Sequence, residues 1–282
     1  MSLLGNAVLV NWGGIVESKE IDYNSWHSKE HMPERIALPG FLRGCRAVGI
    51  SGTELEHKYF MMYEAERKEV FISRKYLERL NNPTKWTKEI LSSYIAPSRT
   101  ICSVIASKSV GFGGCIASIR FLGKDIETKI NTESLKLSVP QVIKLDGITG
   151  MHVLLGDSSF GQMQTEEKSY RSSQGMNDQI ISQAILIEGT DLNSIKRSIS
   201  IIKDEYSITE SNDLIINYYQ CQHIITKQDL TGIWKNIIVK IKRKVLLMSN
   251  EEDIWKLVDN KSEDYIRFSD RVFDIPEILY KE

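Results

Sequence analysis

Residues 24–46 have the sequence NSWHSKEHMPERIALPGFLRGCR and combine a helical pattern with an unusual concentration of reactive side chains. On a helix, His27 and His31 lie four residues apart and face the same way, with Glu34 about one turn further along. Pro33 removes a backbone donor and clashes with the preceding turn, so we expect a bend beside His31. The stretch therefore predicts a bent helix that carries two histidines and a carboxylate close together.

The elements around this stretch follow a recognisable order. The helix is expected to begin at Asp22 or Asn24, and Pro39-Gly40 ends it near Leu38. Apolar alternation predicts strands at residues 6–16, 41–49, 58–66 and 100–107, with a second helical region over residues 70–94. The order strand, helix, strand, strand, helix, strand is that of a ferredoxin-like unit.

The same order begins again after the glycine-rich segment at residues 111–114, which we interpret as a hinge. Strands are expected at residues 115–122, 150–155, 179–188 and 214–225, and helices at residues 134–145 and 192–206. The sequence thus predicts an α+β fold of two tandem βαββαβ units, residues 1–110 and 111–226, whose sheets face each other. The polar segment 158–177 is either a lid or a mobile insertion.

A C-terminal extension, residues 227–282, follows the second unit. Its large apolar side chains are too numerous to be left in water, so we expect residues 230–270 to pack on the core or across a dimer contact. They are Trp234, Ile254, Trp255, Tyr265 and Phe268. The basic cluster at residues 240–244 fits a solvated helix face, with contact to an anionic partner as the alternative.

Composition excludes several classes of protein. The chain has 282 residues, 41% hydrophobic and 26% charged, which is ordinary for a soluble globular protein. A formal net charge of −1 gives no basic field for nucleic acid. No apolar run approaches the length of a membrane helix, and a signal-peptide pattern is missing. The four scattered cysteines form no C-x-x-C pair, which fits a cytoplasmic protein without a disulfide framework.

The histidine pair admits three interpretations. Metal binding needs a third ligand, and the order H-S-K-E-H differs from the zinc motif H-E-x-x-H, so no metal site is expected. A neutral histidine beside a carboxylate is a competent general acid–base near neutral pH. The third interpretation is that both histidines are packing or solvated residues of an amphipathic helix.

Three segments carry a resemblance to a known family. They are WHSKEHMPER at residues 26–35, LPGFLRGCR at 38–46 and KYFMMYE at 58–64. Over residues 6–107 the chain resembles the dimeric α/β-barrel superfamily, in particular its EthD-like branch, through His31-Met32-Pro33 and Pro39-Gly40-Phe41. The resemblance implies that the two sheets pair as a barrel, with a small-molecule pocket between sheet and helices, and it leaves a homodimer open.

The resemblance implies a range of functions, because relatives include cyclases, isomerases, dehydratases and monooxygenases. The leading hypothesis is a cofactor-independent enzyme that acts on an aromatic or polyketide-like carbonyl compound. His31 would be the general acid–base and His27 its partner. The expected ligand-binding residues are Trp26, Glu34, Arg43, Arg46 and Tyr63.

Two alternatives stay open. The first is a non-catalytic binding or assembly protein. The second is a haem- or metal-dependent oxidoreductase, because the chlorite dismutase-like and dye-decolourising peroxidase relatives bind haem. No haem is expected here, since the G-x-x-D-G element of those peroxidases is missing and the histidines of the second half fall on predicted strands. An enzyme should open a cavity of several hundred cubic ångströms at His27 or His31.

Overall fold

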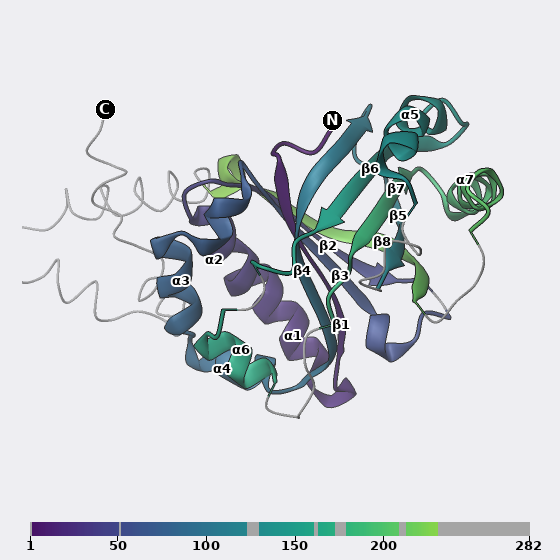
Figure 1. The fold of residues 1–282 in the computed structure, drawn as a ribbon. Coiled ribbons are helices and arrows are strands. Elements are labelled where there is room, and N and C mark those ends of the chain that lie inside the picture. Colours follow the sequence, from purple (N-terminus) through teal and green to yellow (C-terminus); the bar gives the residue numbers. More distant parts are fainter. Residues whose placement is uncertain are drawn as a thin grey trace, which may run out of the picture.

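A computed structural model describes residues 2–50, 52–122, 130–160, 163–172, 179–208 and 213–230. Its centre is a closed barrel of eight antiparallel strands in the order β1-β3-β2-β8-β5-β7-β6-β4 (Figure 1). The strands are β1 (Ala7–Ile15), β2 (Phe41–Gly49), β3 (Tyr59–Ala65), β4 (Tyr94–Ser109), β5 (Cys115–Phe121), β6 (Ile148–Gly156), β7 (Gln183–Gly189) and β8 (Leu214–Thr226). The predicted α+β barrel of paired ferredoxin-like units is confirmed.

Two strand pairings close the barrel. Strand β2 pairs with β8, and β4 pairs with β6, so each junction joins the first half of the chain to the second. This closure leaves no unpaired sheet edge in the barrel. The boundaries of the two units, and of an extension from residue 227, stay predictions. The expected packing of residues 231–270 falls outside the described residues, and a homodimer also stays a prediction.

Alternation along the strands, interrupted at bulges, separates an inner face from an outer face. In β1, Val8, Val10 and Trp12 join the cluster that fills the barrel, whereas Leu9 packs under the helices of the first half. The interior is tightly filled, with Phe60, Met62 and Tyr219 among its buried side chains. We therefore look for a ligand site outside the barrel, between sheet and helices.

Helices cover the outer face in two groups (Figure 1). Over the second half lie α5 (Thr132–Val142) and α7 (Leu192–Glu205), whose apolar faces close a separate cluster against β5, β6 and β7. Over the first half lie α1 (Glu20–Trp26), a π-helical turn (His27–His31), α2 (Met32–Ala37), α3 (Arg74–Asn81) and α4 (Lys85–Leu91). A short sixth helix, α6 (Glu166–Arg171), packs against α3 and α4.

Two element boundaries and one predicted loop differ from the sequence predictions. The first helix begins at Glu17 with a 3-10 turn rather than at Asp22 or Asn24, and acidic side chains near its start favour the helix dipole. Strand β4 begins at Tyr94, where the pattern predicted helix, because a bulge with Ala96 at φ 45° lets the strand continue. The polar segment 158–177 contains α6 and is not wholly a loop.

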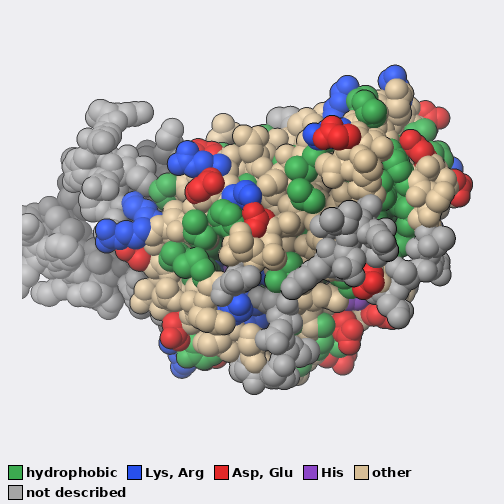
Figure 2. All heavy atoms as spheres, viewed as in Figure 1, with side chains coloured by type: hydrophobic (Ala, Val, Ile, Leu, Met, Phe, Trp, Pro, Cys, Tyr) green, Lys and Arg blue, Asp and Glu red, His purple; other side chains and the backbone are tan. Residues whose placement is uncertain are grey.

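The visible face of the described residues carries charges of both signs (Figure 2). On the face in Figure 2, acidic and basic side chains are interspersed, in keeping with the net charge of −1. Among the described residues, no helix combines the length and apolar character that crossing a membrane requires.

Candidate functional site

The π-helical turn places the two histidines. Its backbone is wound more widely than an α-helix, and the Met32 N–H donates to the carbonyl of His27, five residues back. Pro33 follows within the first turn of α2, where its missing N–H is tolerated. The bend predicted from Pro33 is therefore a widened turn. Such turns are frequent at functional sites.

A small cavity lies between this turn and the sheet. The space open to a water-sized sphere is about 30 Å³, enough for water but far below the several hundred cubic ångströms expected of an enzyme pocket. Its walls come from the outer face of the sheet, from α2, α3 and α4, and from α6. They are Leu9, Asn11, His31, Arg35, Phe41, Tyr63, Tyr76, Leu80, Leu91, Tyr94, Arg99, Glu167 and Arg171.

His31 is a neutral imidazole in this cavity. Burial, with the cations of Arg35 and Arg171 nearby, holds the pKa of His31 well below its usual range. Its ring lies against Trp26, with centroids 4.3 Å apart and planes 33° apart. Its Nδ1 is buried and has no hydrogen-bond partner within the protein. A neutral imidazole nitrogen without a partner can accept a proton or a hydrogen bond from a ligand.

Two further polar atoms of the cavity form no hydrogen bond within the protein, although one of them, Arg35 Nη1, lies within ion-pair distance of Glu34. They are Asn11 Oδ1, from strand β1, and Arg35 Nη1, from α2. A buried polar atom without a hydrogen bond costs about 1–3 kcal/mol, so such atoms are uncommon in a purely structural core. One acceptor, one donor and the imidazole of His31 thus line the same cavity.

His27 stands behind the cavity and does not line it. Its Nε2 lies 3.4 Å from the Tyr63 hydroxyl, and Tyr63 itself is a wall residue. Burial and the nearby Arg46 guanidinium hold the pKa of His27 well below its usual range. His27 can therefore orient Tyr63 and tune its hydroxyl, which is a positioning role.

Trp26 also supports the site from behind. It is fully buried, and its indole Nε1 donates to Thr87 Oγ1 at 3.1 Å. This bond fixes the ring against which His31 lies.

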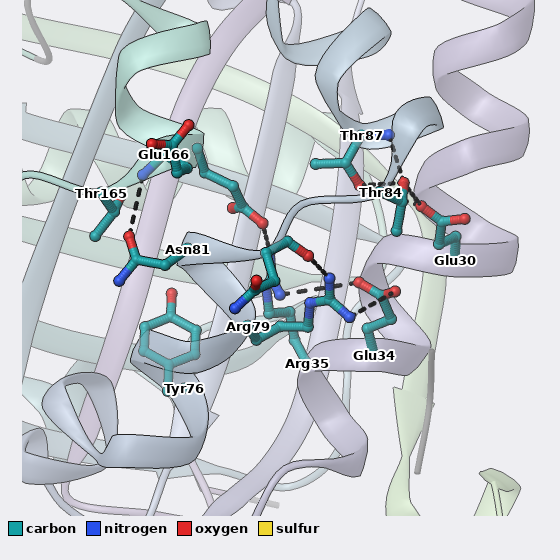
Figure 3. Close-up of polar contacts among 12 residues, drawn as sticks. Glu30, Glu34, Arg35, Tyr76, Arg79, Asn81, Thr84, Thr87, Thr165 and Glu166 are labelled. Atoms are coloured by element: carbon teal, nitrogen blue, oxygen red, sulfur yellow. Dashed lines mark hydrogen bonds and ion pairs between the residues drawn. The ribbon is translucent and has the colours of Figure 1, made fainter. Parts of the chain in front are cut away.

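Glu34 is close to the site without lining it. Its carboxyl lies 3.9 Å from Arg35 and 3.7 Å from Arg79 (Figure 3). Burial raises the pKa of Glu34 to about 7, and the two arginines oppose the rise. The carboxyl is therefore part of an ion-pair network beneath the cavity.

Neither Arg43 nor Arg46, the two arginines predicted to bind a ligand, lines the cavity, and the reasons differ. Strict alternation from Phe41 would place Arg43 on the outer face, but a bulge between Phe41 and Arg43 inverts the alternation. Arg43 therefore points into the barrel and pairs with Glu64 at 2.6 Å. Arg46 is on the outer face, but it donates to the Asn24 carbonyl at 3.2 Å and does not reach the cavity.

The cations that do line the cavity are Arg35, Arg99 and Arg171, which sequence reasoning missed. Arg35 forms a buried ion pair with Glu167 of α6, and Arg99 donates to the Tyr76 hydroxyl at 3.0 Å. Three guanidinium groups against one wall carboxylate leave the lining cationic. Such a lining favours a ligand with negative charge.

Helix α6 closes the cavity from the second half of the chain. It belongs to the segment between β6 and β7, yet it lies across α3 and α4 (Figure 1). The Glu166 N–H donates to Asn81 Oδ1 at 3.2 Å (Figure 3), and Lys88 lies over the Tyr170 ring. A second small cavity shares Arg99, Glu167 and Arg171 with the first. Which of the two roles predicted for segment 158–177 applies stays a prediction, and its described helix α6 lies beside both cavities.

Among the described residues we identify no formed haem pocket. As it stands, the cavity at His31 is too small for a porphyrin, as it is for any ligand larger than water. In the second half, His152 points into the barrel and contacts Ser107 and Glu188, while α5 and α7 fill the outer face. The one carboxylate–histidine cluster of metal-binding dimensions among the described residues is Glu54, Glu56 and His57. Both of its carboxylates are exposed, and we assign no site to it.

Comparison with solved structures identifies proteins of similar fold. No family model matches the chain, and no curated protein does. An anthrone oxidase-like protein matches with a TM-score of 0.54 and 10% identity, over 80% of this chain and 95% of its own. A monooxygenase-like protein from Fusobacterium nucleatum matches with a TM-score of 0.50 and 10% identity, over 79% and 96%.

A chlorite dismutase-like structure is more distant, with a TM-score of 0.45 and 12% identity over 77% of this chain and 94% of its own. At such identities the similarity establishes the ferredoxin-like α/β-barrel fold alone. Because no sequence family matches, the EthD-like branch stays a prediction.

Proposed function

We propose that the protein binds an anionic aromatic carbonyl compound at His31 and removes an acidic C–H proton that is conjugated with its carbonyl group. The observation that carries the proposal is the convergence in one cavity of three polar atoms that form no hydrogen bond within the protein, His31 Nδ1, Asn11 Oδ1 and Arg35 Nη1. The rings of Phe41 and Tyr63 supply a wall for an aromatic ligand.

Each group then has a defined role. His31 is neutral and accepts the proton at Nδ1. The negative charge that develops on the substrate oxygen is stabilised by Arg35, and it also raises the pKa of His31 as the proton moves. Asn11 accepts a hydrogen bond from a phenol or enol hydroxyl. His27 and Trp26 hold Tyr63 and His31 in place.

The subsequent chemistry depends on the substrate. Reprotonation at another carbon gives an isomerase, loss of a neighbouring hydroxyl gives a dehydratase, and attack on a second carbonyl gives a cyclase. All three begin with the proton abstraction assigned to His31. The fold is also that of an anthrone oxidase-like protein, and anthrone is a three-ring aromatic ketone with an acidic CH₂ group.

Binding such a ligand requires the cavity to expand. The two small cavities share Arg99, Glu167 and Arg171 as lining residues. Outward movement of α6 would enlarge them and leave the barrel strands paired, because the main packing partners of α6 are α3 and α4. We therefore assign α6 the role of a cover that opens for the ligand.

The cavity's small size supports one second candidate, a protein that binds a ligand without transforming it. Thermal melts and calorimetric titrations with anthrone and a carboxylated anthrone separate the two. The catalytic proposal expects tighter binding of the carboxylated compound and product formation. It also expects His31→Gln to lower turnover by about 10²–10⁴-fold while affinity changes less.

The matched control is His57→Gln, which makes the same substitution outside the cavity. Binding with neither product nor proton exchange supports the second candidate. If neither compound shifts the melting temperature or gives binding heat, the site proposal is wrong.

A further inference from the structure

Two free cysteines meet inside the barrel at a junction between the two halves of the chain. Cys45 of β2 and Cys221 of β8 have their Sγ atoms 4.0 Å apart. Cys45 is buried in the barrel cluster, and Cys221 packs against that cluster while staying partly exposed. The strands that carry them, β2 and β8, form one of the two pairings that close the barrel.

We propose that Cys45 and Cys221 form a redox-active dithiol, which a peroxide converts into a disulfide between β2 and β8. The proposal does not depend on the ligand site. It rests on the contact of the two sulfur atoms, on their unequal exposure and on the local strand geometry.

The unequal environments give the two thiols different roles. The hydrogen bond from Cys45 lowers the pKa of the Cys221 thiol, whereas the same contact and burial raise the pKa of Cys45. The partly exposed Cys221 is therefore the thiol that reaches a peroxide first, as its thiolate. Cys45, buried beside it, is placed to resolve the product.

The strands allow the two sulfurs to approach. Cys221 pairs with Ala47, so Cys45 is its diagonal neighbour on the inner face. The ladder is already interrupted between Arg46 and Ala47 by a bulge. Bond formation shortens the sulfur separation by about 2 Å, and side-chain rotation with adjustment at the bulge supplies that movement.

Oxidation by a peroxide takes two steps. The Cys221 thiolate attacks one peroxide oxygen, an S–O bond forms, the O–O bond breaks, and water leaves after proton uptake. The Cys45 sulfur then attacks the sulfenic acid of Cys221, so that the S–S bond forms, the S–O bond breaks and a second water leaves with the Cys45 proton. Two thiols are oxidised, and one hydrogen peroxide is reduced to two waters.

The other cysteines provide internal controls. Cys102 is fully buried, and its Sγ contacts the Thr100 carbonyl. Cys115 is partly exposed, but it packs with the outer cluster, on the opposite side of the barrel wall from Cys221. Cys115 is thus partly exposed, like Cys221, but has no second thiol beside it. The Cys115→Ser variant should therefore oxidise like the wild type.

The experiment treats the full chain with hydrogen peroxide, removes the oxidant, and counts free thiols after unfolding. We expect the count to fall from four to two, with a loss of two hydrogen atoms in mass. Peptide mapping should recover one pair joining residues 45 and 221, which dithiothreitol separates. Cys45→Ser should instead stop at an oxygenated Cys221, and Cys221→Ser should keep all its thiols.

The mapping is done on the wild type, so the test holds even if a variant folds poorly. The proposal fails if four thiols remain. It also fails if Cys221 accumulates as sulfinic acid in the wild type, or if the crosslinked peptides contain Cys115.

Discussion

Replacing Glu167 with alanine removes the carboxylate through which α6 holds the cavity closed. The Arg35 and Glu167 side chains are 3% and 5% exposed, so Arg35 would be left as a buried cation without its main partner. Breaking a buried pair in this way costs about 3–5 kcal/mol. Glu34 lies 3.9 Å from Arg35 and offers partial compensation, so we expect a loss near the lower end of that range.

For a chain of this size, a loss of about 3 kcal/mol corresponds to a melting temperature lower by roughly 6–12 °C. Urea unfolding of Glu167→Ala, Arg35→Met and the double variant measures the coupling directly. We expect the double variant to be more stable than Glu167→Ala, because it leaves no buried charge unpaired. A loss below about 1 kcal/mol in Glu167→Ala, the range of an exposed ion pair, would refute the position assigned to α6.

Three further perturbations test other parts of the structure. The pKa of Glu34 is raised to about 7 in the folded chain. The stability contributed by the neutral Glu34 carboxyl is therefore present at low pH and is lost as pH rises from about 4.5 to 7. Glu34→Gln should remove roughly 3 kcal/mol of that pH dependence in denaturant titrations. Gly40 has φ +80°, and an added Cβ would lie 2.4 Å from Val70 Cγ2, so thermal melts of Gly40→Ala should show a loss of about 1–3 kcal/mol. Arg120 is buried over the Trp12 ring, and its Nε and Nη1 atoms form no hydrogen bond. In urea unfolding, Arg120→Met should therefore leave the free energy of unfolding unchanged or raise it. A decrease of more than about 2 kcal/mol would contradict this.

The fold could be predicted because its signals are local and repeated. Strand β3 alternates cleanly, with Tyr59, Met61 and Tyr63 in the outer cluster and Phe60 and Met62 in the inner one. The glycine-rich segment near residue 111 separates two strand and helix orders that the structure joins in one barrel. Periodicity carries this information without any knowledge of long-range contacts.

The ligand cavity was harder to predict, because its walls come from distant parts of the chain. His31 and Tyr63 lie in the quoted motif segments, and both line the cavity. Glu167 and Arg171 belong to a six-residue helix that is too short to show periodicity. A signal was present, since Thr165 followed by two glutamates is a typical helix start. Its docking on α3 is a long-range contact that one sequence does not reveal.

Arg43 shows how one extra residue changes a prediction. Its charge suggested contact with an anionic group of a ligand, but the bulge turns its side chain into the barrel toward Glu64. Bulges depend on the partner strand, so alternation within β2 alone could not indicate this one.

Exchange of hydrogen for deuterium tests directly whether His31 takes a proton from a bound ketone. Anthrone or its carboxylated form is mixed with the protein in deuterated buffer, and deuterium in the acidic CH₂ group is followed by NMR. We expect the wild type and His57→Gln to catalyse deuterium incorporation. In His31→Gln it should be slower by about 10²-fold or more, while calorimetry still detects binding. Wash-in at the wild-type rate by a folded, ligand-binding His31→Gln variant would contradict it.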